Sequence, residues 1–410
     1  MALDLVLRRA RIAGRGDTPL DIGVSGGRIA VIEQNIATDA QELKLDGCLV
    51  VPGFVDTHIH LDKSCILDRV SQEKDTLEEA IAEVAAAKRA FTMEDVYARG
   101  RRTLEKAIVQ GTTHMRTHVE VDPRIGLRSF EAIRRLKQDY RWAITLEICV
   151  FPQEGLINDP GTEDLLVKAC EAGANLIGGC PYTDTQPNEQ IARIFSIARR
   201  FDLDIDFHLD FDLDPSWMHL DEVCRQTEAF GWGGRVAVGH VTKLSAVDSK
   251  NLDRIARRLS DVGVAVTVLP ATDLFLMGRG HEHSVPRGVA PAHELLHRGV
   301  TCSLATNNVL NPFTPFGDCS LIRMANLYAN IARLGRASDI AACLDMVTSL
   351  PAKLMNLTDY GIAVGHAADI VALDCRDGHA AVAELAQPLF ALKAGWKSFS
   401  RSPAMLHPPG

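Results

Sequence analysis

The chain has 410 residues, a net formal charge of −9 and an apolar content of 46%. No apolar run is long enough to span a membrane, and no basic stripe is present that could neutralise phosphates. The composition therefore argues against a membrane protein and against a nucleic-acid partner. Ten cysteines without a C-x-x-C pair or a regular spacing argue against a disulfide framework and a zinc–thiolate site, and they predict a reducing cytoplasm.

Short strands are predicted at both ends of the chain. Residues 4–12 partly alternate between apolar and polar side chains, and residues 21–32 form two apolar runs around Gly26-Gly27, which is a hairpin pattern. Residues 365–374 form another strand of the same kind. The two ends therefore predict one small β domain, a β-sandwich built from residues 1–50 and 360–410.

The middle of the chain alternates between apolar strands and amphipathic helices. The first helices are predicted at 76–91, which begins with the capping-box sequence Thr76-Leu-Glu-Glu79, and at 93–110. Strands are predicted at residues 51–58, 113–119, 142–151, 176–180, 205–209, 236–241, 264–269 and 301–304. Eight strands in βα alternation predict a parallel sheet, and a (β/α)₈ barrel of residues 51–359 is its simplest form, which a chain of this length allows.

Two histidines, His58 and His60, end the first strand of this predicted barrel. On a strand, residues i and i+2 face the same side, so the two imidazoles can converge as nitrogen ligands of a divalent metal. In isolation, a His-x-His pair is more often a chance feature of a loop. Further single histidines at the ends of later strands make the metal interpretation the better one.

In (β/α) barrels the working residues lie at the carboxyl ends of the strands. After the first strand, those ends carry His118, Gln153, Cys180, His208, His240 and Thr306-Asn307-Asn308. Three or four nitrogen ligands with an open position describe a catalytic metal site, although any one of these histidines alone is better explained as a core or rim residue. A second His-x-His, His281-Glu-His283, lies in a Gly- and Arg-rich segment and is interpreted as exposed or lid-like.

Several motifs together resemble the amidohydrolase superfamily and, within it, the cytosine deaminase-like group that includes hydrolases of N-alkylated amino-triazines. They are Pro52-Gly-Phe-Val-Asp-Thr-His-Ile-His60, Arg116-Thr-His-Val119, Phe151-Pro-Gln-Glu-Gly155, the strand that ends at His208, Gly239-His240, Asn311-Pro-Phe-Thr-Pro-Phe-Gly317 and Asp359-Tyr-Gly-Ile-Ala363. The resemblance covers nearly the whole chain. It implies a (β/α)₈ barrel with a flanking β domain and one divalent metal ion, zinc or iron.

The resemblance also implies roles for individual residues. His58, His60 and His208 correspond to metal ligands, and His240 to the group that polarises the bond under attack or shuttles protons. Gln153 corresponds to an amide that orients the substrate. Lys63 resembles a lysine that the amino-triazine hydrolases present to an oxygen-rich ring, although it could equally form a rim salt bridge with a neighbour such as Asp62.

Two positions depart from the pattern of cytosine deaminases. Phe211 stands where those enzymes have a proton-handling glutamate, and Asn307 where they have an aspartate that binds the metal and accepts the proton of its water. A carboxamide is not a base at neutral pH, and losing a general base typically costs about 10²–10⁴ in rate. His240 is the first candidate for the missing base. Asp210, Asp212 and Asp318 are others, although each is also explained by a surface or helix-capping role.

The sequence therefore predicts a metal-dependent hydrolase that cleaves a C–N bond, an exocyclic amine or a ring amide, of a nitrogen heterocycle such as a pyrimidine or triazine. Asn307 is assigned to the catalytic group with His240. Lys63, Gln153, Phe211 and Asn308 are assigned to substrate binding, and aromatic residues such as Tyr182 and Trp217 either stack on a ring or simply pack. The alternative is a metal-poor barrel that binds a small heterocycle without deaminating it. A homo-oligomer is a further expectation.

Overall fold

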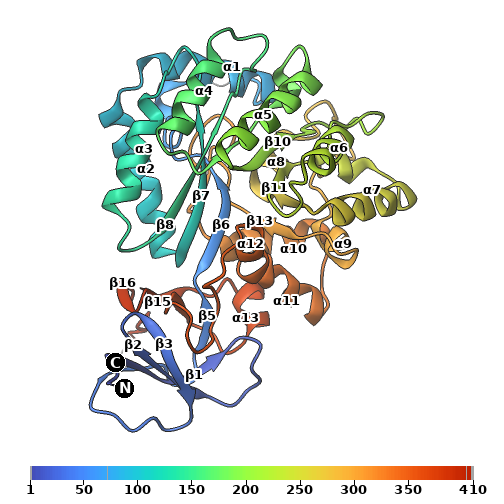
Figure 1. Ribbon diagram of the computed structural model, residues 1–410. Helices are drawn as coiled ribbons and strands as arrows, with labels where there is room; N and C mark the ends of the chain where they lie inside the picture. The colour runs from blue at the N-terminus through green and yellow to red at the C-terminus, as the bar shows by residue number, and fades with distance from the viewer. Residues whose placement is uncertain (1, 72, 403, 408–410) are drawn as a thin grey trace.

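The computed structural model describes residues 2–71, 73–402 and 404–407, and it contains a barrel and a smaller β sheet (Figure 1). The small sheet lies at one end of the barrel and is built from strands near both termini. Its strands are β1 Leu5–Ile12, β2 Leu20–Ser25, β3 Arg28–Glu33, β4 Gln41–Lys44, β5 Leu49–Pro52, β14 Ile370–Leu373, β15 Pro388–Lys393 and β16 Trp396–Ser400. They pair in the order β16-β15-β14-β5-β1-β2-β3, with β4 on β1, so the two chain ends meet where β14 pairs antiparallel with β5.

The barrel is a parallel sheet of eight strands that follow one another in chain order. They are β6 Phe54–Ile59, β7 Thr112–Glu120, β8 Thr145–Phe151, β9 Leu176–Ile177, β10 Asp204–Leu209, β11 Val236–His240, β12 Val264–Val268 and β13 Cys302–Leu304. A parallel bridge between Ile59 and Asn307 joins the last segment to the first, and His60 N–H donates to the Asn307 carbonyl at 2.9 Å. The predicted barrel with a terminal β domain is confirmed, and it closes at two of the predicted site residues.

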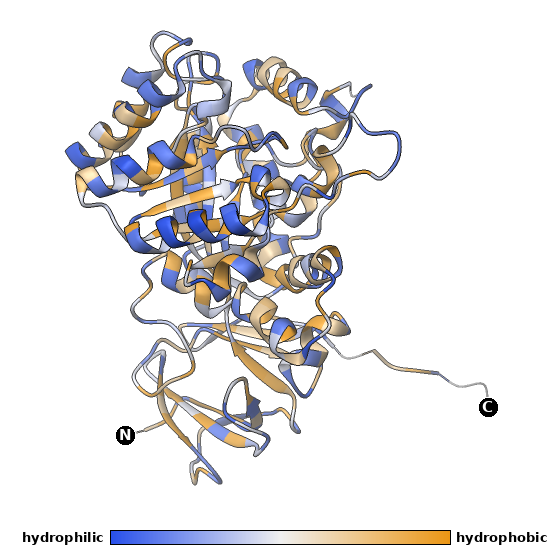
Figure 2. Ribbon diagram, turned by 90° about the vertical axis from the view of Figure 1, so that its right-hand side faces the viewer, coloured by the Kyte–Doolittle hydropathy of each residue, from blue (hydrophilic) through white to orange (hydrophobic). Residues whose placement is uncertain are grey.

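Helices surround the barrel and turn their apolar faces inward, so that polar residues colour their outer sides in Figure 2. The α-helices are α1 Leu77–Ala87, α2 Met93–Val109, α3 Arg128–Asp139, α4 Thr162–Glu171, α5 Pro187–Phe201, α6 Leu220–Phe230, α7 Ser249–Val262, α8 Pro270–Leu276, α9 Ala292–His297, α10 Leu321–Ala332, α11 Ala337–Asp345, α12 Ser349–Leu354 and α13 Gly378–Ala383. Short 3₁₀ turns are η1 Leu67–Arg69, η2 Lys88–Ala90, η3 Pro181–Thr183 and η4 Thr242–Ala246. Across the described ranges, no helix has the length and apolar character needed to cross a bilayer.

Some element boundaries differ from the sequence prediction for physical reasons. The run predicted as one strand at 51–58 is divided at Gly53: β5 belongs to the terminal sheet and β6 to the barrel. A side chain at Gly53 would lie 2.1 Å from Thr113 Oγ1, so only glycine allows the chain to pass here. Strand β8 starts at Thr145 rather than at residue 142, because Trp142 lies on the surface with 55% of its area exposed.

Candidate metal centre and active site

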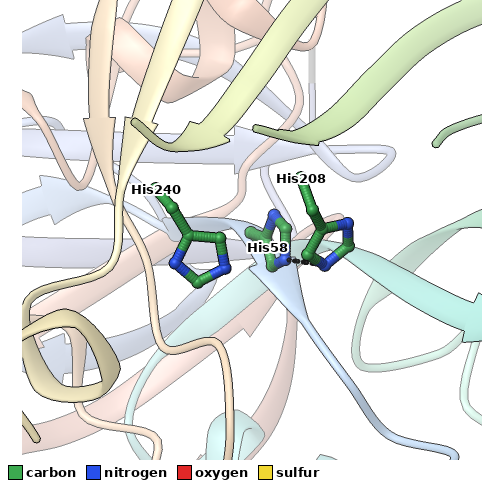
Figure 3. Close-up of side chains that lie close together, drawn as sticks. All are labelled: His58, His208 and His240. Atoms are coloured by element: carbon green, nitrogen blue, oxygen red, sulfur yellow. Dashed lines mark hydrogen bonds between the residues drawn. The ribbon is translucent and has the colours of Figure 1, made fainter. Parts of the chain in front are cut away.

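Five histidines gather at the carboxyl ends of the barrel strands. His58 lies in β6 and His60 directly follows it, His118 lies near the end of β7, and His208 and His240 lie at the ends of β10 and β11. All five side chains are buried. Figure 3 shows three of them, from different strands, turned toward one another. The parallel sheet thus brings together residues that lie up to 182 positions apart, as the strand-end argument predicts.

The Nε2 atom of His208 lies close to the Nε2 atoms of two other rings. His208 Nε2 lies 3.0 Å from His58 Nε2 and 3.1 Å from His60 Nε2. Nitrogens that bind one tetrahedral zinc ion at 2.0–2.1 Å lie about 3.3 Å apart, so these two spacings are compatible with a shared cation as well as with hydrogen bonds between neutral rings. The Nδ1 atoms of the three rings are buried and have no hydrogen-bond partner within the protein.

The electrostatic surroundings keep these rings neutral. Burial lowers the pKa values of His58, His60 and His208 well below the ordinary histidine value, and the neighbouring imidazoles and the Lys63 ammonium lower them further. Neutral imidazole is the form that binds a metal. The donor set and its protonation state therefore fit a divalent cation.

Asn307 has an unsatisfied side chain, and its backbone pairs with that of His58 and His60. It is fully buried, and neither its Oδ1 nor its Nδ2 has a hydrogen-bond partner. A buried carboxamide without partners is costly, about 1–3 kcal/mol for each unmet group, unless a ligand or an ion completes it. Asn308 is also buried, but its Oδ1 accepts from Asn311 Nδ2 at 2.6 Å.

The backbone at these strand ends is strained. Asp210, His240, Val241 and Asn307 have φ angles of 49°, 69°, 43° and 63°, in the left-handed region that disfavours side chains. Such conformations cost of order 1–3 kcal/mol each and cluster at functional sites. Gly239 makes room in the same place, because a Cβ there would lie 3.1 Å from His58 Nδ1.

His240 is fixed by Asp273, a residue that the sequence analysis did not assign to the site. Asp273 lies on α8 directly after the seventh barrel strand, and its Oδ1 is 2.7 Å from His240 Nδ1. Burial raises the pKa of Asp273, and the contact with His240 partly offsets that rise. Because the carboxylate occupies Nδ1, Nε2 is the nitrogen that His240 has left for other partners. The Phe211 ring stacks on this imidazole with centroids 3.8 Å apart. An acidic residue five positions after a strand end is the pattern that could have revealed Asp273.

His118 belongs to a second buried group. It stacks on His58 with ring centroids 3.7 Å apart, and its Nε2 lies 3.6 Å from Asp206 Oδ1. Arg116 Nη1 donates to Asp206 Oδ2 at 2.8 Å. Burial raises the pKa of Asp206, but His118 and Arg116 outweigh it and keep that pKa below the ordinary value. His58, His118 and Asp206 each place one possible ligand atom within 4.8 Å of those of the other two residues. His58, His208 and His240 do the same.

Lys63 and Gln153 contact each other deep in the site. Lys63 Nζ donates to Gln153 Oε1 at 3.0 Å and to Glu120 Oε1 at 2.7 Å, and it lies 4.3 Å from the centre of the Phe313 ring. The salt-bridge partner of Lys63 is therefore Glu120 rather than its sequence neighbour Asp62. Two of the three ammonium N–H groups are engaged, so one remains for a ligand. Gln153 directs its Nε2 to Cys180 Sγ at 3.3 Å.

Other candidates from the sequence are held in structural roles. Asp210 accepts from the backbone N–H groups of His219 and Leu220 at 2.9 and 3.1 Å, at the start of α6. Asp318 is exposed and accepts from Ser320 N–H and Arg323. Asp212 pairs with Lys243 at 3.2 Å, and the same lysine lies over the ring of Trp217. His281 and His283 are exposed.

A buried ion network supports the site from behind Lys63. Lys88 Nζ lies 2.7 Å from Glu120, 2.5 Å from Asp122 and 2.6 Å from Glu154. Burial lowers the pKa of Lys88, but the three carboxylates outweigh it and raise that pKa above its ordinary value. Because η2 carries Lys88, this cation holds the α1–η2 segment against the ends of β7 and β8.

Replacing Lys88 with methionine should destabilise the fold strongly. The substitution leaves three clustered carboxylates without their shared cation, and breaking buried ion pairs in this way costs about 3–5 kcal/mol. Urea unfolding at neutral pH measures the loss. The exposed Lys74→Met variant is the matched control, and a Lys88→Met protein as stable as that control would contradict the role given to Lys88.

The same network predicts a pH dependence of stability. Burial and the neighbouring Glu120 raise the pKa of Glu154 to about 7 from its ordinary value of 4.5. The folded state therefore favours protonated Glu154, so this stabilising contribution is complete below pH 4.5 and is lost as the pH rises through about 7. Between pH 5 and pH 8, the free energy of unfolding measured by urea titration should fall less in Glu154→Gln than in the wild type. An unchanged pH slope, equal to that of the surface variant Glu163→Gln, would refute this assignment.

The chain is similar to known proteins over most of its length. A family model described as the amidohydrolase family matches residues 41–139 and 128–389. N-isopropylammelide isopropyl amidohydrolase of Pseudomonas sp. (strain ADP) is 28% identical over 405 residues, which cover 96% of each chain. Pterin deaminase of Rhizobium rhizogenes is 29% identical over 363 residues, covering 87% of this chain and 82% of the relative.

Two solved structures are similar to this chain over nearly its whole length. The 5-methylcytosine deaminase of Klebsiella pneumoniae, liganded with 5-fluorocytosine, has a TM-score of 0.94 at 27% identity and covers 98% of this chain and 99% of its own. N-isopropylammelide isopropylaminohydrolase of Burkholderia multivorans has a TM-score of 0.85 at 26% identity and covers 97% and 98% of the two chains.

Proposed function

This chain belongs to the amidohydrolase family, and from that premise we propose that it is a metal-dependent hydrolase that cleaves a C–N bond of a nitrogen heterocycle such as a pyrimidine or triazine. The bond is an exocyclic amine or a ring amide. The observation that carries the proposal is that His208 Nε2 lies 3.0 Å from His58 Nε2 and 3.1 Å from His60 Nε2, among buried side chains. The relatives support it, because their names describe hydrolysis or deamination of ammelide, pterin and 5-methylcytosine.

His58, His60 and His208 would hold a single divalent ion, zinc or iron, and Asn307 would offer a neutral amide oxygen beside it. Three protein ligands leave a position open, as in catalytic rather than structural sites. An ion held there supplies a water molecule acidic enough to act as the nucleophile at neutral pH.

The chain's own residues would then manage protons and position the ring. His240 would accept and donate the proton at Nε2, because Asp273 occupies Nδ1. The imidazole can act as the general base, whereas the carboxamide of Asn307 cannot. Gln153 and Asn308 present amide groups that can hydrogen-bond the ring edge, and Lys63 has one N–H left for a ring oxygen. Phe211 stacks on His240 and would shield one face of its ring from water.

The alternative is a barrel that binds a heterocycle without hydrolysing it. Asn307 and Phe211 motivate this alternative, but the compared proteins give it no support, since those named above are enzymes. The two functions differ in metal content and in product.

Metal analysis followed by a substrate screen tests the proposal. Purified protein should contain about one equivalent of zinc or iron per chain. Incubation with pyrimidines, triazines and cyclic amides should release ammonia, an amine or a ring-opened acid, and removing the metal with a chelator should stop the release. Protein that carries no metal after loading and releases no product from any ring would overturn the proposal.

A further inference from the structure

A cavity of about 580 Å³ is bordered by α8, α10 and the segment that carries the second His-x-His. Its volume lies within the range of about 300–1,000 Å³ that is usual for small-molecule sites. His281 of that motif lines it together with apolar side chains, which form most of the wall. The apolar residues include Leu274, Phe275, Met277, Val285, Phe316 and Leu327.

Helix α8 separates this cavity from the metal centre. Asp273 is fully buried and contacts His240, whereas the next two residues, Leu274 and Phe275, line the cavity. Successive residues of an α-helix point about 100° apart, so one helix can serve two sites. Among the described residues that line the cavity, none is one of the five clustered histidines. The cavity is therefore a neighbour of the proposed active site and not a part of it.

The apolar wall is open to solvent. Phe316 has 61% of its area exposed, and Val285 has 52%. The Phe316 ring meets the Phe275 ring edge to face, with centroids 6.0 Å apart. Single exposed apolar residues are normal, but several that border one hollow usually mark a binding site. Two rings in this wall favour a ligand with an aromatic body.

Two guanidinium groups give the cavity a positive charge. Arg279 and Arg323 line it, and the described lining residues include no acid. Their Nε atoms are engaged, by the Phe275 carbonyl and by Asp318, both at 2.9 Å. Within the described ranges, their terminal Nη atoms make no hydrogen bond to protein, and Asp75 lies 3.7 Å from Arg279 Nη1. These N–H groups are available to an anion, and their forked geometry matches a carboxylate.

We propose that this cavity is a second binding site, for a small organic anion with an aromatic body, such as an aryl carboxylate. The carboxylate pairs with the guanidinium groups of Arg279 and Arg323, and the ring packs against Phe275 and Phe316. The ligand contacts the helix that holds Asp273 against His240, so it binds beside the active site without entering it. This site does not depend on the hydrolytic function proposed above.

Calorimetric titration of the purified protein with two naphthalene derivatives tests the site. 2-Naphthoate is an anion at neutral pH, and 2-naphthamide has the same rings without the charge. The naphthoate should bind one site per chain about five- to tenfold more tightly, because each partly exposed charge pair contributes a factor of about 1.4–5. The double variant Arg279→Met/Arg323→Met should remove this preference and still bind both rings. Phe316→Ser should weaken both probes to a similar extent.

Arg257→Met is the matched control, because it removes the same charge from an exposed position of α7 and should leave both affinities unchanged. Equal affinity for the two probes, binding of neither, or a preference that survives in the double variant would overturn the inference.

Two further measurements exclude other occupants. The titration is repeated after chelator treatment, and a loss of naphthoate affinity would place the probe at a metal ion and overturn the inference. Sedimentation compares the wild type with Phe316→Ser, and a smaller assembly of the variant would show that a second copy covers this face, which would also overturn it. Failure of the naphthoate site leaves the proposed function untouched, because metal content and product release test that function separately.

Discussion

Replacing His208 with alanine should abolish metal binding and hydrolysis together. His208 Nε2 is the atom that both other Nε2 atoms approach, at 3.0 and 3.1 Å, so its removal leaves only two nitrogen ligands. Loss of residues that merely orient a ligand already costs about 10–100-fold in metal affinity, and loss of a ligand itself should cost more. Elemental analysis after dialysis should find little metal in this variant, against about one equivalent per chain in the wild type.

The buried histidine His114 provides a control for general destabilisation. It lies near the start of β7, at the opposite end of that strand from His118, and contacts Thr113 and Lys393 rather than the cluster. His114→Ala should lower the melting temperature but retain metal and activity. If His208→Ala kept its metal, or if His114→Ala lost it equally, the proposed ligand set would be wrong.

The sequence predicted the architecture and the histidine cluster because both follow from short-range patterns. Strand alternation marked the barrel, and the rule that parallel strands end at one face placed His58, His60, His208 and His240 together. The strand predicted at residues 51–58 is divided at Gly53, where a side chain would clash with Thr113, a residue 60 positions away. Such a contact leaves no local pattern.

The partners of the site residues could not be predicted for the same reason. Arg116 and Asp206 are 90 positions apart, and Lys63 and Glu120 are 57 apart. Sequence proximity suggested Asp62 as the partner of Lys63, but the barrel brings Glu120 to it from the next strand. Which carboxylate neutralises which cation depends on side-chain packing, and that information lies in the three-dimensional arrangement.

The Asp273→Asn variant should keep its metal but lose most of its activity. Asp273 is fully buried, and its contact with His240 Nδ1 at 2.7 Å fixes which ring nitrogen faces the pocket. An asparagine of the same shape can donate to Nδ1 and so favour the tautomer with the proton on Nε2, which cannot accept another. Loss of a general base, or of its correct tautomer, typically costs about 10²–10⁴ in kcat.

The pattern of changes separates this positioning role from a structural one. In Asp273→Asn, kcat should fall while KM and the metal content stay close to the wild-type values, because His58, His60 and His208 are unaltered. The exposed Asp261→Asn variant on α7 should behave as the wild type in all three measurements. A variant that lost metal or stability in proportion to its activity would show that Asp273 supports the fold. A variant with unchanged kcat would contradict the role of His240 as the proton-transfer group. The site would then have no identified base in place of Asn307.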